Sequence, residues 1–239
     1  MLSATNLTKI IDGREILKDV SLSLKSGEIV SVIGPSGSGK TTLLRAISLI
    51  DPPSSGELSI GENEYVFPSR EGGNIKLPYP NLTVVFQQLF IWPHVTIREN
   101  ILLPLRGKVD VKYFNEMIKL FQMDGFLDRY PNEVSIGQRQ RAAIVRALLL
   151  KPKYLLLDEV TSALDIEQSY LILGHLKRIA EEGVGIIFVS HALHLMSKIS
   201  DKVIFLDEGK IAEEGTGAIL TDPKTERLKK FIGISQQVI

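Results

Sequence analysis

A run of nine residues near the start of the chain has the composition of a loop that binds nucleotide phosphates. Gly34-Pro35-Ser36-Gly37-Ser38-Gly39-Lys40-Thr41-Thr42 fits the pattern G-x-x-x-x-G-K-[ST]. Glycines at these positions let successive backbone N–H groups point inward as an anion-binding nest, and a following helix adds the positive end of its dipole. The pattern predicts that Lys40 reaches the β- and γ-phosphates and that the Thr41 hydroxyl binds Mg²⁺.

The residues on either side of this loop give the pattern its structural context. Residues Glu28 to Ile33 form an apolar run rich in β-branched side chains, which is typical of a buried strand. Residues Leu43 to Ile50 combine good helix formers with apolar residues at helical spacing. A glycine-rich turn that carries a lysine by chance is the alternative interpretation. Strand, glycine loop and helix in this order are the context that phosphate binding requires.

A second group of chemically capable residues lies later in the chain. Tyr154 to Leu157 form an apolar strand that ends in Asp158 and Glu159. Asp158 can hold Mg²⁺ through water, and Glu159 can polarise an attacking water molecule. Taken alone, the stretch could be a strand followed by a solvated turn. Together with the phosphate loop, it favours a site that hydrolyses a nucleoside triphosphate.

The elements that must position these groups alternate in type after Lys153. Strands are expected at Tyr154–Leu157, Gly185–Ser190 and Lys202–Leu206, with helices at Ile166–Glu181 and Leu193–Ile199. This alternation predicts an α/β fold with a mostly parallel sheet and helices on both faces. A hairpin turn at residues 207–210 and a mostly helical end, Thr216–Ile232, are expected to follow.

The first two-thirds of the chain adds two other kinds of structure. Antiparallel strands are expected within Leu2–Leu24, around a turn at Asp12-Gly13, and further strands at residues 57–61 and 82–86, with an exposed loop at 68–80. The composition then changes between Trp92 and Pro131. Helices are predicted at Thr96–Leu103, Val111–Gln122, Phe126–Tyr130 and Gln138–Leu150. The sequence therefore predicts a helical insertion into the α/β core.

The composition limits the function classes that remain. Lys plus Arg and Asp plus Glu number 28 each among 239 residues, so no global field favours nucleic acid or an anionic membrane surface. The absence of cysteine excludes disulfides and thiolate metal sites and fits a reducing compartment. The first six residues do not have the character of a signal peptide, and no apolar run approaches the roughly 20 residues that span a bilayer. Any connection to a membrane is therefore expected to run through a partner.

One further motif carries a resemblance to a known family. Val134-Ser135-Ile136-Gly137-Gln138 resembles the LSGGQ signature of ATP-binding cassette (ABC) ATPases. The resemblance covers nearly the whole chain in six motifs that follow the order of the family. They are Gly34–Thr42, Gln87 after its strand, Val134–Gln138, Leu155–Glu159, residues 162–165 (Ser-Ala-Leu-Asp) and His191. Six ordered motifs are far more specific than any one of them.

The resemblance implies a P-loop NTPase fold and a division of the chain. Residues 1–239 would be one ABC ATPase domain. Residues 1–90 and 151–239 would form the nucleotide-binding core with its antiparallel β subdomain, and 91–150 a helical subdomain that carries the signature. In such proteins two cassettes pair head to tail, with ATP between the phosphate loop of one and the signature of the other. Ser135, Gly137 and Gln138 would contact the nucleotide of the partner.

The resemblance also assigns roles to single residues. Gln87 is similar to the glutamine that touches Mg²⁺ and the attacking water and that links the site to the helical subdomain, so it joins Thr41 and Asp158 as a metal-site residue. His191 is similar to the histidine that contacts the γ-phosphate and orients the water with Glu159, and Asp165 to the aspartate that contacts the opposite cassette. Taken singly, His191 and Gln87 could be ordinary polar residues at strand ends.

The chain departs from the family pattern at three positions. Ile136 replaces the first glycine of the signature, and Val160 replaces the proline that usually follows the catalytic glutamate. Ile11 stands where the family usually has an aromatic residue that stacks on adenine, so base binding is expected to be weaker or less selective. The glutamate itself, Glu159, is intact, which argues against an inactive cassette.

We interpret the chain as the ATP-hydrolysing subunit of a membrane transporter. The segment Leu89–Asn100 and the tail Pro223–Phe231 are similar to polar amino-acid importer ATPases. The resemblance implies a homodimer that binds ATP and Mg²⁺ at the cytoplasmic face of the inner membrane. It also implies integral-membrane permease subunits, a solute-binding protein reached through the permease, and no nucleic-acid partner. The apolar stretch Phe90-Ile91-Trp92 is expected to line a groove for a short permease helix; packing within the subdomain is the alternative.

Other functions remain open at this point. The ATPase of an exporter or of a lipid- or lipoprotein-handling system would carry the same motifs. Soluble cassette ATPases of DNA repair or translation usually carry tandem cassettes or a long coiled-coil insertion, and neither fits in 239 residues. A small-molecule kinase would share the phosphate loop but not the signature or His191, and a purely structural nucleotide-binding module is disfavoured by Glu159.

Overall fold

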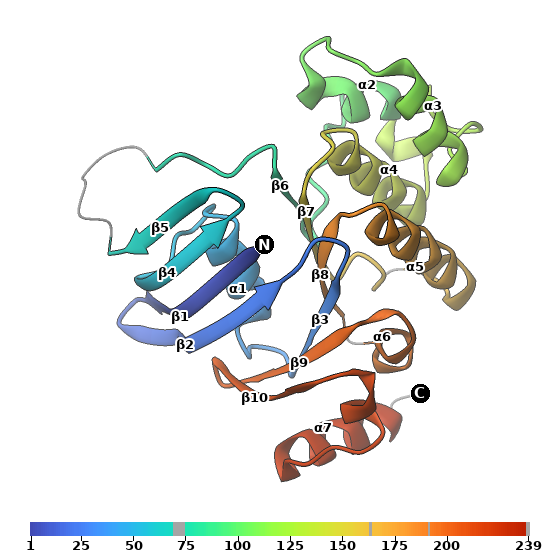
Figure 1. Ribbon diagram of the computed structural model, residues 1–239. Helices are drawn as coiled ribbons and strands as arrows, with labels where there is room; N and C mark the ends of the chain where they lie inside the picture. The colour runs from blue at the N-terminus through green and yellow to red at the C-terminus, as the bar shows by residue number, and fades with distance from the viewer. Residues whose placement is uncertain (69–74, 163, 191, 238–239) are drawn as a thin grey trace.

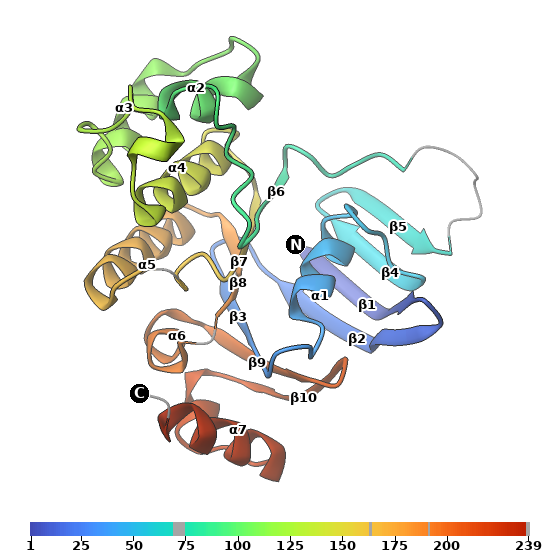
Figure 2. The same cartoon turned by 180° about the vertical axis from the view of Figure 1, so that it is seen from behind.

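The computed structural model describes residues 1–68, 75–162, 164–190 and 192–237 of the chain. In this part of the chain the strands form two sheets, one of four strands in the order β2-β1-β4-β5 and one of six in the order β10-β9-β3-β8-β7-β6. Helices cover the larger sheet, and a separate group of helices lies beyond its β6–β7 end (Figures 1 and 2).

The six-stranded sheet forms the centre of the molecule. Its strands are β3 (Ile29–Ile33), β6 (Leu82–Val85), β7 (Tyr154–Asp158), β8 (Gly185–Val189), β9 (Lys202–Asp207) and β10 (Lys210–Gly215). The pairs β3–β8, β3–β9, β6–β7 and β7–β8 are parallel, whereas β9 and β10 form an antiparallel hairpin at the edge. Every residue of β3, β7 and β8 is buried, as expected for strands covered on both faces.

The four-stranded sheet is antiparallel throughout. It contains β1 (Leu2–Ile11), β2 (Arg14–Leu24), β4 (Ser55–Ile60) and β5 (Asn63–Phe67). Its apolar face shares one hydrophobic cluster with α1 (Lys40–Ile47) and with residues of β3, including Val30 and Val32. Helix α1 therefore packs between the two sheets, and its first residue follows directly from the phosphate loop.

The helical group is formed by α2 (Ile97–Leu102), α3 (Val111–Leu120) and α4 (Ile136–Leu148), with short 3₁₀ turns at Leu103–Leu105 and Pro131–Glu133. The larger sheet is covered by α5 (Ile166–Glu181), α6 (Leu193–Ile199), the 3₁₀ turn Gly217–Leu220 and α7 (Glu226–Gln237). Among the described residues, no helix combines the length and the apolar character needed to cross a bilayer.

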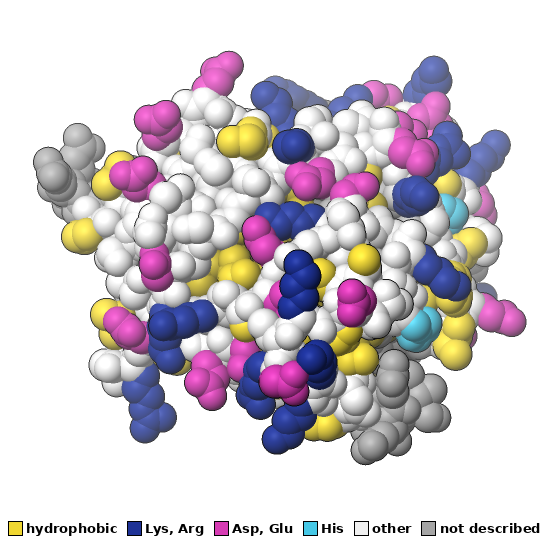
Figure 3. Space-filling model, turned by 60° about the horizontal axis from the view of Figure 1, so that its bottom comes forward, with side chains coloured by type: hydrophobic (Ala, Val, Ile, Leu, Met, Phe, Trp, Pro, Cys, Tyr) yellow, Lys and Arg dark blue, Asp and Glu magenta, His cyan; other side chains and the backbone are white. Residues whose placement is uncertain are grey.

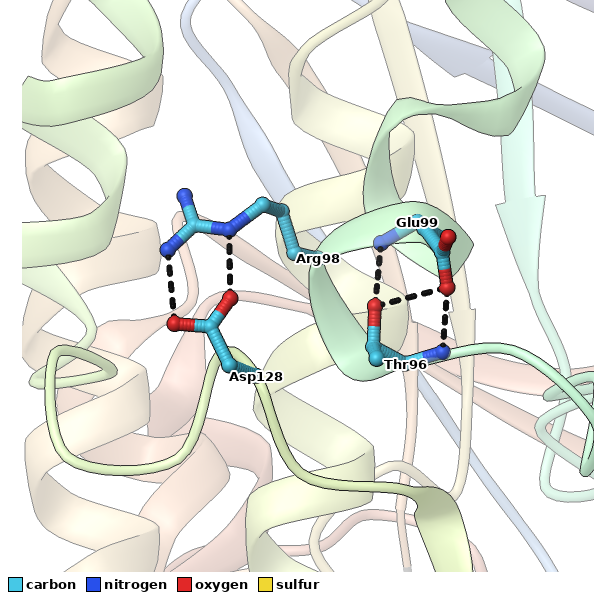
Figure 4. A network of polar contacts seen from close by, with 4 residues as sticks. All are labelled: Thr96, Arg98, Glu99 and Asp128. Carbon is cyan, nitrogen blue, oxygen red and sulfur yellow. Dashed lines mark hydrogen bonds and ion pairs between the residues drawn. The ribbon is translucent and has the colours of Figure 1, made fainter.

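A local capping box fixes the start of α2 (Figure 4). The Thr96 hydroxyl accepts a hydrogen bond from the Glu99 N–H at 3.2 Å, and the Glu99 carboxylate accepts one from the Thr96 N–H at 2.7 Å. The hydrogen bonds that the Glu99 carboxylate accepts from the Thr96 N–H and the Thr96 hydroxyl lower the pKa of Glu99 below its usual value. Beside the box, Arg98 donates two hydrogen bonds to Asp128, at 2.7 and 3.2 Å. They tie the segment before α4 to α2.

The expected helix at Phe126–Tyr130 is wrong. The segment forms turns, with the Phe126 N–H donating to Met123 O and the Arg129 N–H to Phe126 O. The carbonyls of Leu127 and Arg129 instead accept from the first N–H groups of α2, those of Arg98 and Ile97. Because a neighbouring helix uses these carbonyls, they do not form an i to i+4 ladder.

Two other expectations need correction. Strand β5 was not expected from the sequence; its residues Asn63–Phe67 alternate between partly exposed and exposed positions before Phe67 is buried. The expected helix at Thr216–Ile232 is two elements, the turn Gly217–Leu220 and α7, and Pro223 lies between them. On the face shown in Figure 3, acidic and basic side chains are interspersed, in keeping with the formal net charge of +0.

Candidate functional site

The phosphate loop leaves the carboxyl end of β3 and ends at α1. Gly34 has φ 154° and Gly39 has φ 104°. A Cβ atom at Gly34 would lie 2.0 Å from the Leu206 carbonyl oxygen, and one at Gly39 would lie 3.0 Å from the Ile16 carbonyl oxygen. Backbone crowding therefore excludes a side chain at Gly34, and the positive φ at Gly39 disfavours one there. Two flanking strands, β9 and β2, thus hold the loop against the sheet.

Lys40 lies at the first position of α1, with only 6% of its surface exposed. Its Nζ donates to the carbonyls of Gly34 at 2.8 Å and Pro35 at 2.9 Å, within the loop itself. Burial lowers the pKa of Lys40, while the charges of Glu159 and Asp158 act in the opposite direction. The ammonium is thus aimed into the loop, with acidic groups close enough to affect its pKa.

Asp158 ends β7 and is the most buried acidic group of the site, at 3% exposure. Within the described residues its Oδ1 has no hydrogen-bond partner. Burial raises the pKa of Asp158, the Glu159 charge adds to this shift, and a hydrogen bond from Thr41 and the charge of Lys40 oppose it. A buried carboxylate oxygen without a partner, beside a threonine hydroxyl, is a donor set that suits a hard cation.

These residues fit Mg²⁺ in the manner of nucleotide sites. Among the described residues, no group of three or more His, Asp or Glu side chains could hold a metal by itself. Mg²⁺ is usually bound by one or two carboxylates together with phosphates and waters. Thr41 and Asp158 are the residues that would supply protein oxygens to such a site, next to the loop expected to bind phosphate.

Glu159 follows Asp158 in an unusual backbone conformation. Its φ is 52°, in the left-handed region, and its N–H donates to the Val189 carbonyl of the neighbouring strand β8 at 2.9 Å. The Ser162 hydroxyl and N–H both donate to the Glu159 carbonyl, at 2.9 and 3.1 Å. Non-glycine residues held in this region are enriched at functional sites. The backbone contacts thus fix a partly exposed glutamate just past the end of the sheet.

Gln87 lies two residues beyond β6 and is exposed. Strand β6 pairs in parallel with β7, with Val85 opposite Leu157, so Gln87 and Asp158 leave the same edge of the sheet on neighbouring strands. The structure therefore brings Gln87 to the edge that carries the loop, Asp158 and Glu159. His191, predicted for the same edge after β8, lies outside the described residues.

Ile11 ends β1 and is 38% exposed. It pairs with Arg14 across the hairpin, and β2 then runs past the loop, where the Ile16 carbonyl limits Gly39. The structure thus connects the hairpin that carries Ile11 to the loop through Ile16. Ile16 could not be identified from the sequence, because its contact is made by a backbone carbonyl and leaves no signal in residue type.

The signature residues form the N-terminus of α4. The Ser135 hydroxyl accepts from the Gln138 N–H at 3.2 Å, and the Gln138 side chain accepts from the Ser135 N–H at 2.8 Å. Gly137 is buried, and a Cβ there would lie 2.6 Å from Gln168 Oε1 and 2.7 Å from Leu164 Cδ2. This glycine thus lets α4 approach the N-terminus of α5.

Asp165 is the N-cap of α5, and its carboxylate accepts from the Gln168 N–H at 2.7 Å. The N-termini of α4 and α5, capped by Ser135 and Asp165, therefore lie close to one another, because Gly137 of α4 packs against Gln168 of α5. Both cap residues are exposed, and Ile136, the first residue of α4, is 51% exposed. In both views α4 lies apart from the loop that precedes α1 (Figures 1 and 2).

The fold and this site define a P-loop nucleoside triphosphatase: a phosphate loop between a buried strand and a helix, with two acids at the end of a neighbouring parallel strand. A family model described as "ABC transporter" matches residues 17–162. The chain belongs to the ABC transporter family.

Known proteins resemble the chain over nearly its whole length. It is 36% identical to the arginine transport ATP-binding protein ArtP of Haemophilus influenzae, with 95% of this chain and 97% of ArtP covered. It is 37% identical to the glutamine transport ATP-binding protein GlnQ of Escherichia coli, with 97% and 98% covered. The dimeric structure of a post-hydrolysis state of the ATP-binding cassette MJ0796, bound to ADP and Pi, superimposes with a TM-score of 0.79 at 31% identity, covering 91% of this chain and 99% of that cassette.

These findings confirm the fold class and the enzyme class expected from the sequence. The chain is an ABC ATPase with an α/β P-loop core, an antiparallel β subdomain and a helical group that carries the signature. It binds and hydrolyses ATP as the ATPase subunit of an ABC transporter.

Proposed function

We propose that the chain powers the import of a polar amino acid, as a homodimer bound to permease subunits at the cytoplasmic face of the inner membrane. The observation that carries the proposal is the site around Asp158, where a buried carboxylate oxygen without a partner adjoins Thr41 and Lys40. The substrate class rests on the relatives, which are arginine and glutamine transport proteins. A solute-binding protein would deliver the amino acid to the permease.

In the proposed site the loop from Gly34 to Thr42 binds the phosphates through its N–H groups and Lys40. Thr41, Asp158 and Gln87 would hold Mg²⁺, and the positive charge of the ion would offset the negative charge of the phosphates. Lys40 exchanges loop carbonyls for phosphate oxygens as partners. Ile11 covers the base with an aliphatic surface.

Glu159 is proposed as the general base that accepts a proton from the attacking water. Its backbone contacts to Val189 and Ser162 hold it in place before the nucleotide binds, so little reorganisation is needed. His191, which follows β8, is proposed to contact the γ-phosphate and orient the same water. The strand order places β8 between β3 and β7, hence between the loop and the acids.

A second copy of the chain is proposed to complete the site. Ser135, Gly137 and Gln138 form a helix start that suits phosphate binding but lies apart from the loop of its own chain. A head-to-tail dimer would bring this helix start to the nucleotide of the partner, with Asp165 at the contact. ATP would then join the two chains, and hydrolysis would release them.

The proposal also divides the chain by role. Residues 1–90 and 151–239 would act as the nucleotide-binding core and 91–150 as the helical subdomain. In support, all strands of both sheets come from the first two ranges, while α2 packs against α4 within the third.

A groove between core and helical group is the proposed permease contact. It has a volume of about 810 Å³, and its lining includes Leu49, Tyr79, Phe86, Phe90 and Ala147. Its size and apolar lining suit a short amphipathic helix. Of the three residues expected to line it, only Phe90 does so; Ile91 is packed against the core, and Trp92 is exposed outside the lining.

The test is transport. The chain is purified from its own membranes with an affinity tag, and the complex is reconstituted in vesicles with ATP inside. We expect a multi-span membrane protein to co-purify, and labelled arginine or glutamine to move in the direction of import only with Mg-ATP. ATPase activity stimulated by another solute class, or capture of no membrane protein from intact membranes, would contradict the proposal.

A further inference from the structure

An arginine of α4, the helix that begins at the signature residues, forms hydrogen bonds with the segment that follows Gln87. Arg146, on α4, donates from Nη2 to the Leu89 carbonyl at 2.7 Å and from Nη1 to the Phe90 carbonyl at 2.9 Å. Phe90 has φ 48°, a conformation rare outside glycine, and its carbonyl is one of the two that the guanidinium contacts. The contact lies two and three residues after Gln87.

The same segment also contacts the helix that follows the phosphate loop. Arg45, on α1, places its guanidinium carbon 5.6 Å from the centre of the Phe86 ring. The Phe86 ring in turn meets the Phe90 ring edge to face, at 6.4 Å between centres and 85° between planes. Gln87 therefore lies in a short segment that contacts α1 through Phe86 and α4 through the carbonyls of Leu89 and Phe90.

The guanidinium of Arg146 is well suited to bind the two successive carbonyls of Leu89 and Phe90. Among the described residues no carboxylate forms an ion pair with it, so the two backbone carbonyls are its polar partners. Burial lowers the pKa of Arg146, but guanidinium stays charged at any physiological pH. A planar fork matches two successive carbonyls, whereas a lysine ammonium is a single point that cannot reproduce this geometry.

Helix α4 joins this contact to the signature. Ser135 caps its N-terminus, and Arg146 follows eleven residues later, about 16 Å along the axis at 1.5 Å per residue. We propose that Arg146 is a positioning residue: it fixes Gln87 relative to α4, so that engagement of Ser135 with the nucleotide of the partner sets Gln87 in the site of its own chain. This inference rests on the proposed function of both residues. It predicts that ATP binding at one site of the dimer affects hydrolysis at the other site, through helix α4.

The test uses Arg146→Lys and Arg146→Gln. We expect kcat for ATP hydrolysis to fall about tenfold with KM for ATP within about twofold, because a charge-assisted pair is lost while the phosphate loop is untouched. The Hill coefficient for ATP should fall toward one. Thermal unfolding without nucleotide measures the structural cost of each variant separately.

A matched control lies on the same helix. Arg141 also donates to two successive carbonyls, those of Phe121 at 3.0 Å and Gln122 at 3.3 Å, but these belong to the segment after α3. Arg141→Lys should lower the melting temperature to a similar extent and leave kcat and the Hill coefficient unchanged. If the two lysine variants lower kcat equally, Arg146 acts only through stability and the inference is wrong.

A double-mutant cycle with Gln87→Ala tests most directly whether Arg146 acts through Gln87. If Arg146 acts through Gln87, Arg146→Lys should change kcat by less than about twofold once Gln87 is removed. Additive losses would overturn the inference. Should the Arg146 variants not fold, Phe90→Gly keeps the carbonyl but frees the backbone at an exposed position, and it should lower kcat with the same KM. An unchanged kcat in that variant would also overturn it.

The two proposals fail in different ways. A wild-type chain that does not hydrolyse ATP, or whose ATP-bound form does not dimerise, contradicts the proposed function. A wild-type chain that does both, with an Arg146→Lys variant of normal kcat and Hill coefficient, contradicts only the role of Arg146.

Discussion

Replacing Asp158 by asparagine should make the nucleotide-free protein more stable while stopping hydrolysis. The side chain is 3% exposed, and its Oδ1 has no partner within the described residues. A buried charged oxygen without a hydrogen bond costs stability, and asparagine removes the charge while it keeps nearly the same shape. The Asp158 carboxylate is thus expected to lower the stability of the nucleotide-free protein while it is required for hydrolysis.

The magnitude follows from the contacts of the carboxylate. An unsatisfied buried polar group costs about 1–3 kcal/mol, and more when charged. Thr41 and the Lys40 charge offset part of that cost here, so we expect a gain of about 1–2 kcal/mol in the free energy of unfolding at pH 7.5. In a protein of this size that gain raises the melting temperature by about 2–4 °C per kcal/mol.

The gain should depend on pH in one direction. Burial raises the pKa of Asp158 above its value in the unfolded chain. The folded protein therefore binds this proton more tightly, and the stability that results is present at low pH and lost as the pH rises through the raised pKa. Asparagine does not titrate, so its advantage over aspartate should be largest above that pKa and should shrink as the pH falls toward the ordinary aspartate value.

Differential scanning calorimetry from pH 5 to 8, without nucleotide or Mg²⁺, measures this difference. Asp165→Asn is a matched control, because Asp165 is exposed and caps α5, a role that asparagine fills equally well. Its stability should change by less than about 0.5 kcal/mol. With Mg-ATP the wild type should gain stability that Asp158→Asn does not. An Asp158→Asn protein less stable than wild type at pH 7.5 would refute the reasoning.

Three further outcomes are expected from the site. Lys40→Ala should abolish tight ATP binding in a folded protein, which titration with a fluorescent ATP analogue checks; unchanged affinity would contradict the site. Glu159→Gln should lower kcat by about 10²–10⁴-fold and trap an ATP-dependent dimer in size-exclusion chromatography, which Ser135→Arg should prevent; a dimer that forms equally well without ATP would count against ATP as the link. Ile11→Tyr should increase the preference for ATP over GTP, because an aromatic platform adds about 1–3 kcal/mol of base stacking; a wild type that already strongly prefers ATP would show that another residue covers the base.

The sequence alone predicted the features that depend on neighbouring residues. The phosphate loop between strand and helix was identified from its glycine spacing, because φ preferences act within a few residues. The apolar runs of β7 and β8 were identified because both faces of those strands are buried. The order of the motifs then gave the family, which the comparisons confirm.

Sequence reasoning failed where a distant segment satisfies the backbone. Residues 126–130 have helical composition, but α2 takes the carbonyls of Leu127 and Arg129, and a turn results. The apolar stretch at Phe90, Ile91 and Trp92 was expected to line one groove as a unit. Of these, Phe90 lines the groove of about 810 Å³, Ile91 packs against the core instead, and Trp92 is exposed outside the groove.

The tertiary structure decided which groups meet across long separations. The Arg146 contacts span 56 and 57 residues, and nothing in the local sequence indicates that its guanidinium binds the segment after Gln87. The partnerless oxygen of Asp158 and the burial of Gly137 against Gln168 are likewise results of packing. Residue type and spacing determine what a segment can do, because steric and hydrogen-bonding rules are local. Which atoms are buried, and which partners they find there, depends on how the whole chain closes around them.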